Sequence, residues 1–73
     1  MEYRWEDGFS IAVKIHDNTV TITANPQGLL SLANHLAALS QERTRGAHIH
    51  LDQYNSLEEN SAELIIENRE KNN

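Results

Sequence analysis

The sequence predicts an α+β fold in which two β-hairpins flank one helix, in the order ββαββ. Two runs of alternating apolar and polar residues come before Asn25, a helical period of leucines follows it, and two further alternating runs come after Ala47. Alternation is typical of half-buried strands, and a 3.6-residue period is typical of a helix with one buried side. We therefore expect a four-stranded, largely antiparallel sheet with the helix packed on one face, although the sequence does not fix the strand order.

The first hairpin is predicted over residues 9–24. Between its two runs, Asp17-Asn18 is a pair that tolerates the left-handed backbone of a tight turn. Alternation assigns one set of side chains to the helix side of the sheet: Phe9, Ile11, Val13, Ile15, Val20 and Ile22. The opposite set faces outward: Ser10, Ala12, Lys14, His16, Thr19, Thr21 and Thr23. Tyr3 and Trp5 are candidates for a further edge segment ahead of the hairpin.

The helix is predicted from Pro26 to about Arg43. Asn25 suits the N-cap and Pro26 the first helical position. Arg43 and Arg45 complement the helix dipole at the other end, and Gly46 ends the helix. The 3.6-residue period predicts a buried stripe formed by Leu29, Leu32, Ala33, Leu36 and Leu39. Leu30 and Ala37 lie at its margins and make the stripe wider. The outward or border set is Ser31, Asn34, His35, Ala38 and Gln41.

The second hairpin is predicted from the runs 48–52 and 62–67, joined by a loop over residues 53–61. The aliphatic set on the helix side is Ile49, Leu51, Leu64 and Ile66. The outward set is His48, His50, Asp52, Glu63, Ile65 and Glu67. The long connection has two open interpretations. Either it takes part in recognition, or Tyr54 and Leu57 cover the open end of the core while its polar residues are solvated.

Length and composition predict a single small domain over residues 1–73, with residues 1–8 and 68–73 as candidates for fraying. Apolar residues make up 38% of the chain and charged residues 23%, which is a globular composition. A core of this size rarely contributes more than about 3–5 kcal/mol. Since there is no cysteine, neither a disulfide nor a thiolate metal site can add to that stability. We therefore expect association into a homodimer.

Charge and hydropathy narrow the range of partners. Eleven acidic residues against six basic ones give a net charge of −5, which disfavours nucleic acid because phosphate binding needs clustered cations. A basic protein surface is the better match. The N-terminus has no apolar signal segment and no stretch reaches membrane-spanning length, so we expect neither a membrane partner nor secretion, and we expect the chain in the cytoplasm.

The polar face of the second hairpin is the strongest candidate for chemistry. His48 and His50 lie on one side of a strand, and a nearby carboxylate can complete a metal site. No third ligand stands at a diagnostic spacing, so we favour simple pairing of the histidines with Glu63 and Glu67 across the ladder, and no metal or other cofactor. No Gly-rich phosphate loop or strained nucleophile turn occurs, and one helix on one sheet predicts no pocket, so we expect no enzyme and no catalytic residue. His35 is interpreted as a surface residue.

Several segments resemble the immunity protein 32 family, which is assigned to bacterial polymorphic toxin systems. They are Leu29-Leu30-Ser31-Leu32-Ala33-Asn34-His35-Leu36, His48-Ile49-His50-Leu51-Asp52, Asn55-Ser56-Leu57-Glu58 and Ser61-Ala62-Glu63-Leu64-Ile65-Ile66-Glu67. The resemblance covers about half of the chain, and its most specific part is the pair formed by the His-x-His-Leu-Asp and Glu-Leu-Ile-Ile-Glu motifs. It implies a small cytoplasmic protein that binds and neutralises a cognate toxin.

Two functional hypotheses follow. The first is a protein-binding domain, an immunity protein that neutralises a basic toxin through an acidic surface. Its candidate partner-binding residues are His48, His50, Asp52, Tyr54, Glu58, Glu59, Glu63 and Glu67. The alternative is a self-associating structural domain, or one that binds metal weakly through His48 and His50. A neighbouring toxin gene favours the first hypothesis, and stoichiometric zinc in the purified protein favours the second.

Overall fold

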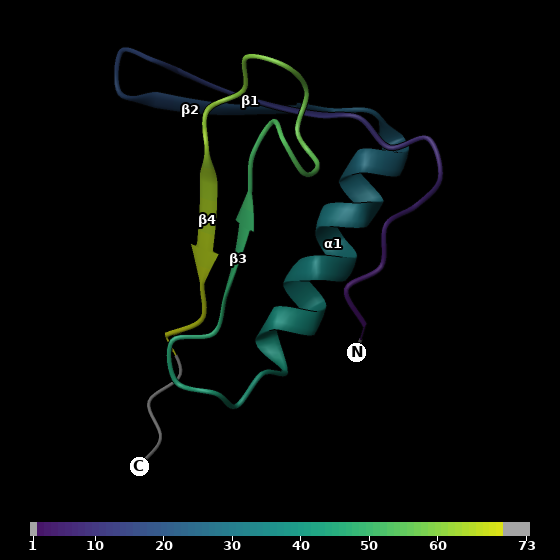
Figure 1. Ribbon diagram of the computed structural model, residues 1–73, viewed down its shortest axis with the longest axis vertical. Coiled ribbons are helices and arrows are strands. Elements are labelled where there is room, and N and C mark those ends of the chain that lie inside the picture. The colour runs from purple at the N-terminus through teal and green to yellow at the C-terminus, as the bar shows by residue number, and fades with distance from the viewer. Residues whose placement is uncertain (1, 70–73) are drawn as a thin grey trace.

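The computed structural model describes residues 2–69, so Met1 and residues 70–73, including most of the C-terminal segment expected to fray, lie outside it. The elements are β1 (Ile11–His16), β2 (Thr19–Ala24), α1 (Pro26–Ser40), β3 (His48–Leu51) and β4 (Leu64–Glu67). This order confirms the α+β class and the ββαββ sequence of elements (Figure 1). The β1–β2 hairpin lies across one end of the molecule, and α1 and the β3–β4 hairpin extend from it side by side.

The prediction of one four-stranded sheet was wrong: within residues 2–69, β1 pairs only with β2, and β3 only with β4, both antiparallel. The reason lies at the second edge of β1. The backbone N–H groups of Glu58 and Ala62 donate to the carbonyls of Ile11 and Val13 at 2.8 Å each, and the Val13 N–H donates to Ser61 Oγ. The connection between β3 and β4 therefore occupies the edge of β1 to which a third strand would bind.

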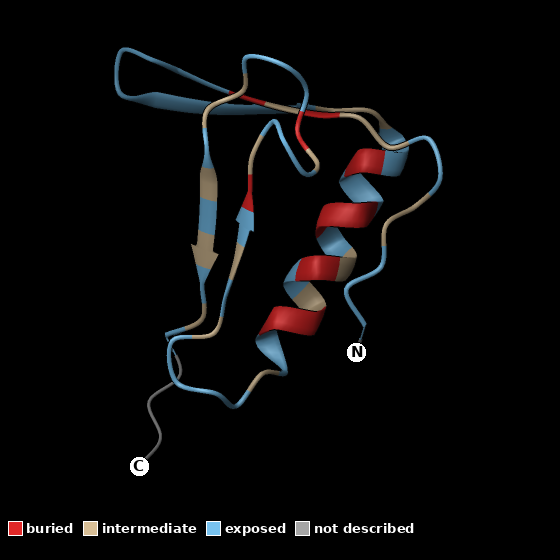
Figure 2. Cartoon of the chain, viewed as in Figure 1, coloured by how far each residue is buried: buried red, intermediate tan, exposed pale blue. Residues whose placement is uncertain are grey.

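The first hairpin has the turn that its sequence predicts. Asp17 and Asn18 have φ values of 48° and 66°, which matches the positive φ values required in a tight two-residue hairpin. Its aliphatic face is buried only where β1 begins (Figure 2). Ile11 and Val13 are fully buried, whereas the predicted inward residues Ile15, Val20 and Ile22 are 62%, 56% and 41% exposed. That part of the prediction was wrong because, among residues 2–69, no other element covers the outer half of the hairpin.

The helix begins as predicted but ends earlier and buries a different side. Asn25 Oδ1 accepts from the Gly28 N–H at 2.7 Å, and Pro26 is the first helical residue. The helix ends at Ser40, so Arg43 and Arg45 follow it rather than occupying its last turn. Its buried residues are Gly28, Ser31, Leu32, His35, Ala38 and Leu39. The predicted stripe members Leu29, Ala33 and Leu36, and the flanking Leu30, are exposed.

The N-terminal segment explains why the buried side of the helix differs from the leucine stripe. The Trp5 ring lies 4.1 Å from the ring of His35 and stacks on Phe9 at 4.5 Å between centroids. The buried hydroxyl of Ser31 accepts from the Glu6 N–H at 2.8 Å. Aromatic side chains and a satisfied polar group therefore cover a side of α1 that hydropathy alone assigns to solvent. The segment around Tyr3 and Trp5 forms no strand.

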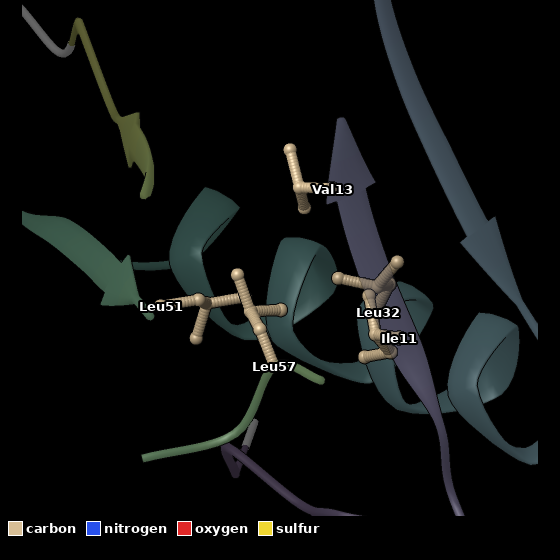
Figure 3. Packing of buried hydrophobic residues seen from close by; sticks show 5 residues of the cluster. All are labelled: Ile11, Val13, Leu32, Leu51 and Leu57. Carbon is tan, nitrogen blue, oxygen red and sulfur yellow. The ribbon is translucent and has the colours of Figure 1, made fainter. Parts of the chain in front are cut away.

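The hydrophobic core lies where the two hairpins meet the helix. Side chains from β1, α1, β3 and the long connection converge there (Figure 3). Its buried members are Ile11, Val13, Leu32, Leu51 and Leu57. Leu57 covers the end of the core, as one interpretation of the loop predicted, whereas Tyr54 is 88% exposed and does not.

Candidate functional site

The polar face of the β3–β4 hairpin is arranged as its alternation predicts. His48 pairs with Glu67, and His50 with Ile65, while Ile49 and Leu51 pair with aliphatic residues on the other face. The side chains of His48, His50 and Glu67 are exposed. Both hairpin strands are only four residues long, so this face is a narrow exposed strip of imidazole and carboxylate groups.

Three groups of this face form a compact cluster at the end of the hairpin nearest the connection. His50 Nε2 lies 2.7 Å from Glu63 Oε2 and 3.6 Å from Asp52 Oδ2. One ligand atom from each residue lies within 4.8 Å of the others. The predicted pairing of His50 with Glu63 is therefore present, and Asp52 joins it because it immediately follows β3. An imidazole and two carboxylates are groups that can hold a divalent cation, although exposed acidic groups often cluster without one.

His48 does not join this cluster. Its Nδ1 lies 3.1 Å from the Gly46 carbonyl; because a carbonyl can only accept, Nδ1 donates the hydrogen. Across the ladder, its partner is Glu67. The cluster therefore groups His50 with two carboxylates and does not include His48, the other histidine of the weak metal hypothesis.

The connecting loop carries the remaining candidate residues. Asp52 Oδ1 accepts from the Tyr54 N–H at 2.9 Å, and the Tyr54 side chain is exposed. Glu58 and Glu59 are also exposed, but the Glu58 backbone is bonded to β1. Nearby, Lys14 Nζ donates to the Asn60 carbonyl at 3.0 Å. The candidate residues therefore fall into two parts, the hairpin face and the loop beside β1, and a lysine lies next to the second part.

The sequence predicted no pocket, but a groove lies beside β3, and His48 and His50 are among the residues that line it. It has a volume of about 710 Å³ and lies between the aromatic side chains of Tyr3, Trp5 and His35 and the residues from Thr44 to Leu51. His35 is only 4% exposed and its Nδ1 donates to the Ser31 carbonyl at 2.8 Å, so its prediction as a surface residue was wrong. The aromatic residues at 3 and 5 were the available signal, because an N-terminal segment rich in aromatics needs an apolar surface to cover.

Tyr3 and Glu42 both line this groove and contact each other. Its hydroxyl donates to Glu42 Oε2 at 3.3 Å. Desolvation of the phenol, followed by the nearby Glu42 charge and this hydrogen bond, raises the pKa of Tyr3 above its ordinary value. The pair links the N-terminal segment to the residues that follow α1.

Comparison with known families now identifies the kind of protein. A family model described as immunity protein 32 matches residues 19–69, from the start of β2 to the end of the described chain. The chain belongs to the immunity protein 32 family. The matched span includes the whole polar face of β3–β4 and the connecting loop, and the resemblance inferred from the sequence is confirmed. Comparisons with curated proteins and with solved structures find no match.

Family membership indicates an immunity role in general, with a toxin as the kind of partner that is bound. Immunity proteins are not typically enzymes. Within residues 2–69, the helix is neither long enough nor apolar enough to cross a membrane.

Proposed function

We propose that this protein neutralises a cognate bacterial toxin by binding it in the cytoplasm through an acidic face. This acidic face consists of His48, His50, Asp52, Tyr54, Glu58, Glu59, Glu63 and Glu67. The observation that carries the proposal is the grouping of the Asp52 and Glu63 carboxylates around His50 within the span matched by the family. Binding alone can neutralise an enzyme when the bound protein covers the substrate cleft, so no catalytic group is required.

The charge of the chain supports a basic partner. Its net charge is −5. Strands β3 and β4 contain no lysine and no arginine. Complementary charge accelerates association and disfavours wrong partners, and its effect falls as salt rises. A toxin that acts on nucleic acid presents a basic cleft to its substrate, and the acidic face is suited to such a surface.

The first experiment identifies the toxin and tests neutralisation. The immobilised protein is used to recover binding proteins from its native host, which are identified by mass spectrometry. Each is then expressed in a susceptible bacterium with and without this chain. We expect one recovered protein to arrest growth alone and to permit growth when co-expressed. If no recovered protein is toxic, or if co-expression leaves the arrest unchanged, the immunity proposal is wrong.

A second experiment locates the contact. Glu63→Lys combined with Glu67→Lys reverses two charges of the acidic face, and we expect slower association with the recovered toxin and a weaker dependence on salt. The matched control is Glu2→Lys with Asp7→Lys, which makes the same charge change at two exposed residues of the N-terminal segment, outside the acidic face. Exposed charges contribute little to stability, so circular dichroism should show both variants folded. Equal slowing in both variants, or in neither, places the interface elsewhere.

A further inference from the structure

Strand β2 is an exposed edge without the features that usually protect one. Its six residues, Thr19 to Ala24, include no charged residue and no proline, and all but Ala24 are exposed. Natural proteins commonly protect free edges with lysine, proline, bulges or a covering element, because unpaired backbone groups readily pair with another strand. Within residues 2–69, no hydrogen bond or strand partner is found on the outer edge of β2.

The hydrogen bonds of β1 show which backbone groups of β2 are available. The carbonyls of Ile11 and Val13 point away from β2, toward the long connection. Successive residues of a strand point to opposite edges, so Ala12, Lys14 and His16 bond with their β2 partners, which are Thr23, Thr21 and Thr19. The backbone N–H and C=O groups of Val20 and Ile22 therefore face the free edge.

The side chains of β2 are aliphatic on one face and threonines on the other, where β1 contributes Ala12, Lys14 and His16. Val13 pairs with Ile22, and Ile15 with Val20, so these four lie on one face of the hairpin; the last three side chains remain 41–62% exposed. The threonines of β2 lie on the opposite face. Such an edge favours a strand that is itself aliphatic on one face and small and polar on the other.

We propose that β2 pairs antiparallel with β2 of a second copy of this chain, forming a four-stranded sheet across a two-fold axis. A two-fold contact is self-complementary. With the axis at Thr21, Val20 lies opposite Ile22 of the partner subunit, and each threonine of β2 lies opposite a threonine of the other copy. Cross-strand pairs of this kind stabilise a sheet. The absence of charge on β2 also fits a second copy: two chains of net charge −5 meet there without facing acidic groups, and the strand offers a basic toxin no complementary charge.

The dimer is independent of the proposed function, because it uses β2 while the acidic face lies on β3, β4 and their connection. In Figure 1 the β3–β4 hairpin extends away from the first hairpin, so its polar face remains available in each copy. If the protein neutralises no toxin, the dimer proposal still stands. If the protein is monomeric, the toxin-binding proposal still stands.

The test uses the full chain and two matched variants. Val20→Lys places like charges close together at the two-fold contact, and Ile65→Lys makes the same change on β4 at a side chain that is equally exposed, 56% in both cases. By analytical ultracentrifugation, we expect the wild type and Ile65→Lys to form dimers with a dissociation constant of about 100 μM or lower. This is a modest affinity that suits a small interface. We expect Val20→Lys to raise the dissociation constant by about tenfold or more, with an unchanged circular dichroism spectrum.

Amide hydrogen exchange provides a readout that other dimers cannot imitate. In a monomer, the amides of Thr21 and Thr23 are bonded to β1, whereas those of Val20 and Ile22 face solvent. The proposal predicts protection of Val20 and Ile22 that is lost on dilution, with Thr21 as the internal reference. A wild type that stays monomeric at about 1 mM overturns the proposal, as does a dimer whose Val20 and Ile22 amides exchange freely. Protection of those amides only after addition of the toxin assigns the edge to that partner instead, and also overturns it.

Discussion

The two hairpins of this protein have the same pattern of alternation but differ in how their aliphatic faces are covered. In β1–β2, the aliphatic face is buried at Ile11 and Val13 and open beyond them. In β3–β4, both aliphatic pairs, Ile49 with Ile66 and Leu51 with Leu64, are at least partly buried. The difference follows from the connections: the tight turn of the first hairpin brings no covering side chain, whereas the long connection of the second brings Leu57 into the core.

Alternation therefore predicts which side chains share a face, but it does not predict whether that face is covered. Coverage depends on segments that are distant in sequence. The outer half of β1–β2 is consequently an open apolar surface, and the polar face of β3–β4 is an open charged one. We have proposed different partners for these two regions, a second copy at the β2 edge beside the first surface and a basic toxin at the second.

The helix residue that joins the two hairpins should give the largest effect on stability. Leu32 contributes to the core together with Ile11 of β1 and Leu51 of β3. Leu32→Ala removes buried methylene groups and leaves a cavity, so we expect a loss of about 2–4 kcal/mol in the free energy of unfolding, measured by urea denaturation. The matched control is Leu36→Ala, one helical turn away and 46% exposed, with an expected loss below about 1 kcal/mol.

This pair of variants tests which side of the helix faces the hairpins. A loss for Leu36→Ala as large as that for Leu32→Ala contradicts the observed arrangement and restores the stripe that hydropathy predicts. A small loss for both indicates that the hairpins do not depend on their contact with the helix.

Local signals in the sequence were sufficient to predict the helix and the strands, whereas contacts between distant segments were not predictable. The Asp17-Asn18 turn, the Asn25 cap and the alternation in both hairpins depend on neighbouring residues, and the structure confirms all three. The separation into two sheets depends on Ser61 and Ala62 binding to β1. The burial of His35 depends on Trp5. Neither contact leaves a periodic signal in the sequence.

The candidate site shows the same division. The outward positions of His48, His50 and Glu67 follow from strand alternation and are observed. The cluster of His50 with Asp52 and Glu63 also depends on how the chain leaves β3 and enters β4, which register alone does not define. The groove depends on the path of the N-terminal segment over α1, for which the sequence offered only the aromatic residues themselves.

The link between the connection and the first hairpin should have a smaller effect on stability than the core. Ser61 Oγ accepts from the partly buried Val13 N–H at 3.1 Å, and Ser61→Ala leaves that donor without its acceptor. We expect a loss of about 1–2 kcal/mol in urea denaturation. The control is Ser56→Ala, whose hydroxyl donates to the adjacent Asn55 side chain at the surface, with an expected loss of about 0.5 kcal/mol or less. Equal losses indicate that the connection does not hold β1 through this hydrogen bond.

The smallest effect concerns the contact that holds the N-terminal segment beside the groove. The chain has two tyrosines, so Tyr54→Phe leaves Tyr3 as the only one, and its ionisation can be followed by ultraviolet absorbance. Desolvation and Glu42 raise its pKa above the ordinary value of 10.0, and we expect a titration midpoint above that value. Adding Glu42→Gln removes the negative charge and should lower the midpoint.

The sign of the linked stability follows from the same shift. Because the pKa of Tyr3 is higher in the folded protein, its contribution is fully present below pH 10.0 and is lost as the pH rises through the folded pKa. Since both side chains reach the surface, we expect the change to be small and to diminish in high salt. A midpoint that Glu42→Gln leaves unchanged means that Glu42 does not influence Tyr3. The N-terminal segment is then held by its other contacts, which include the Trp5 ring against His35 and the hydrogen bonds from Asn34 to Arg4 and Glu6.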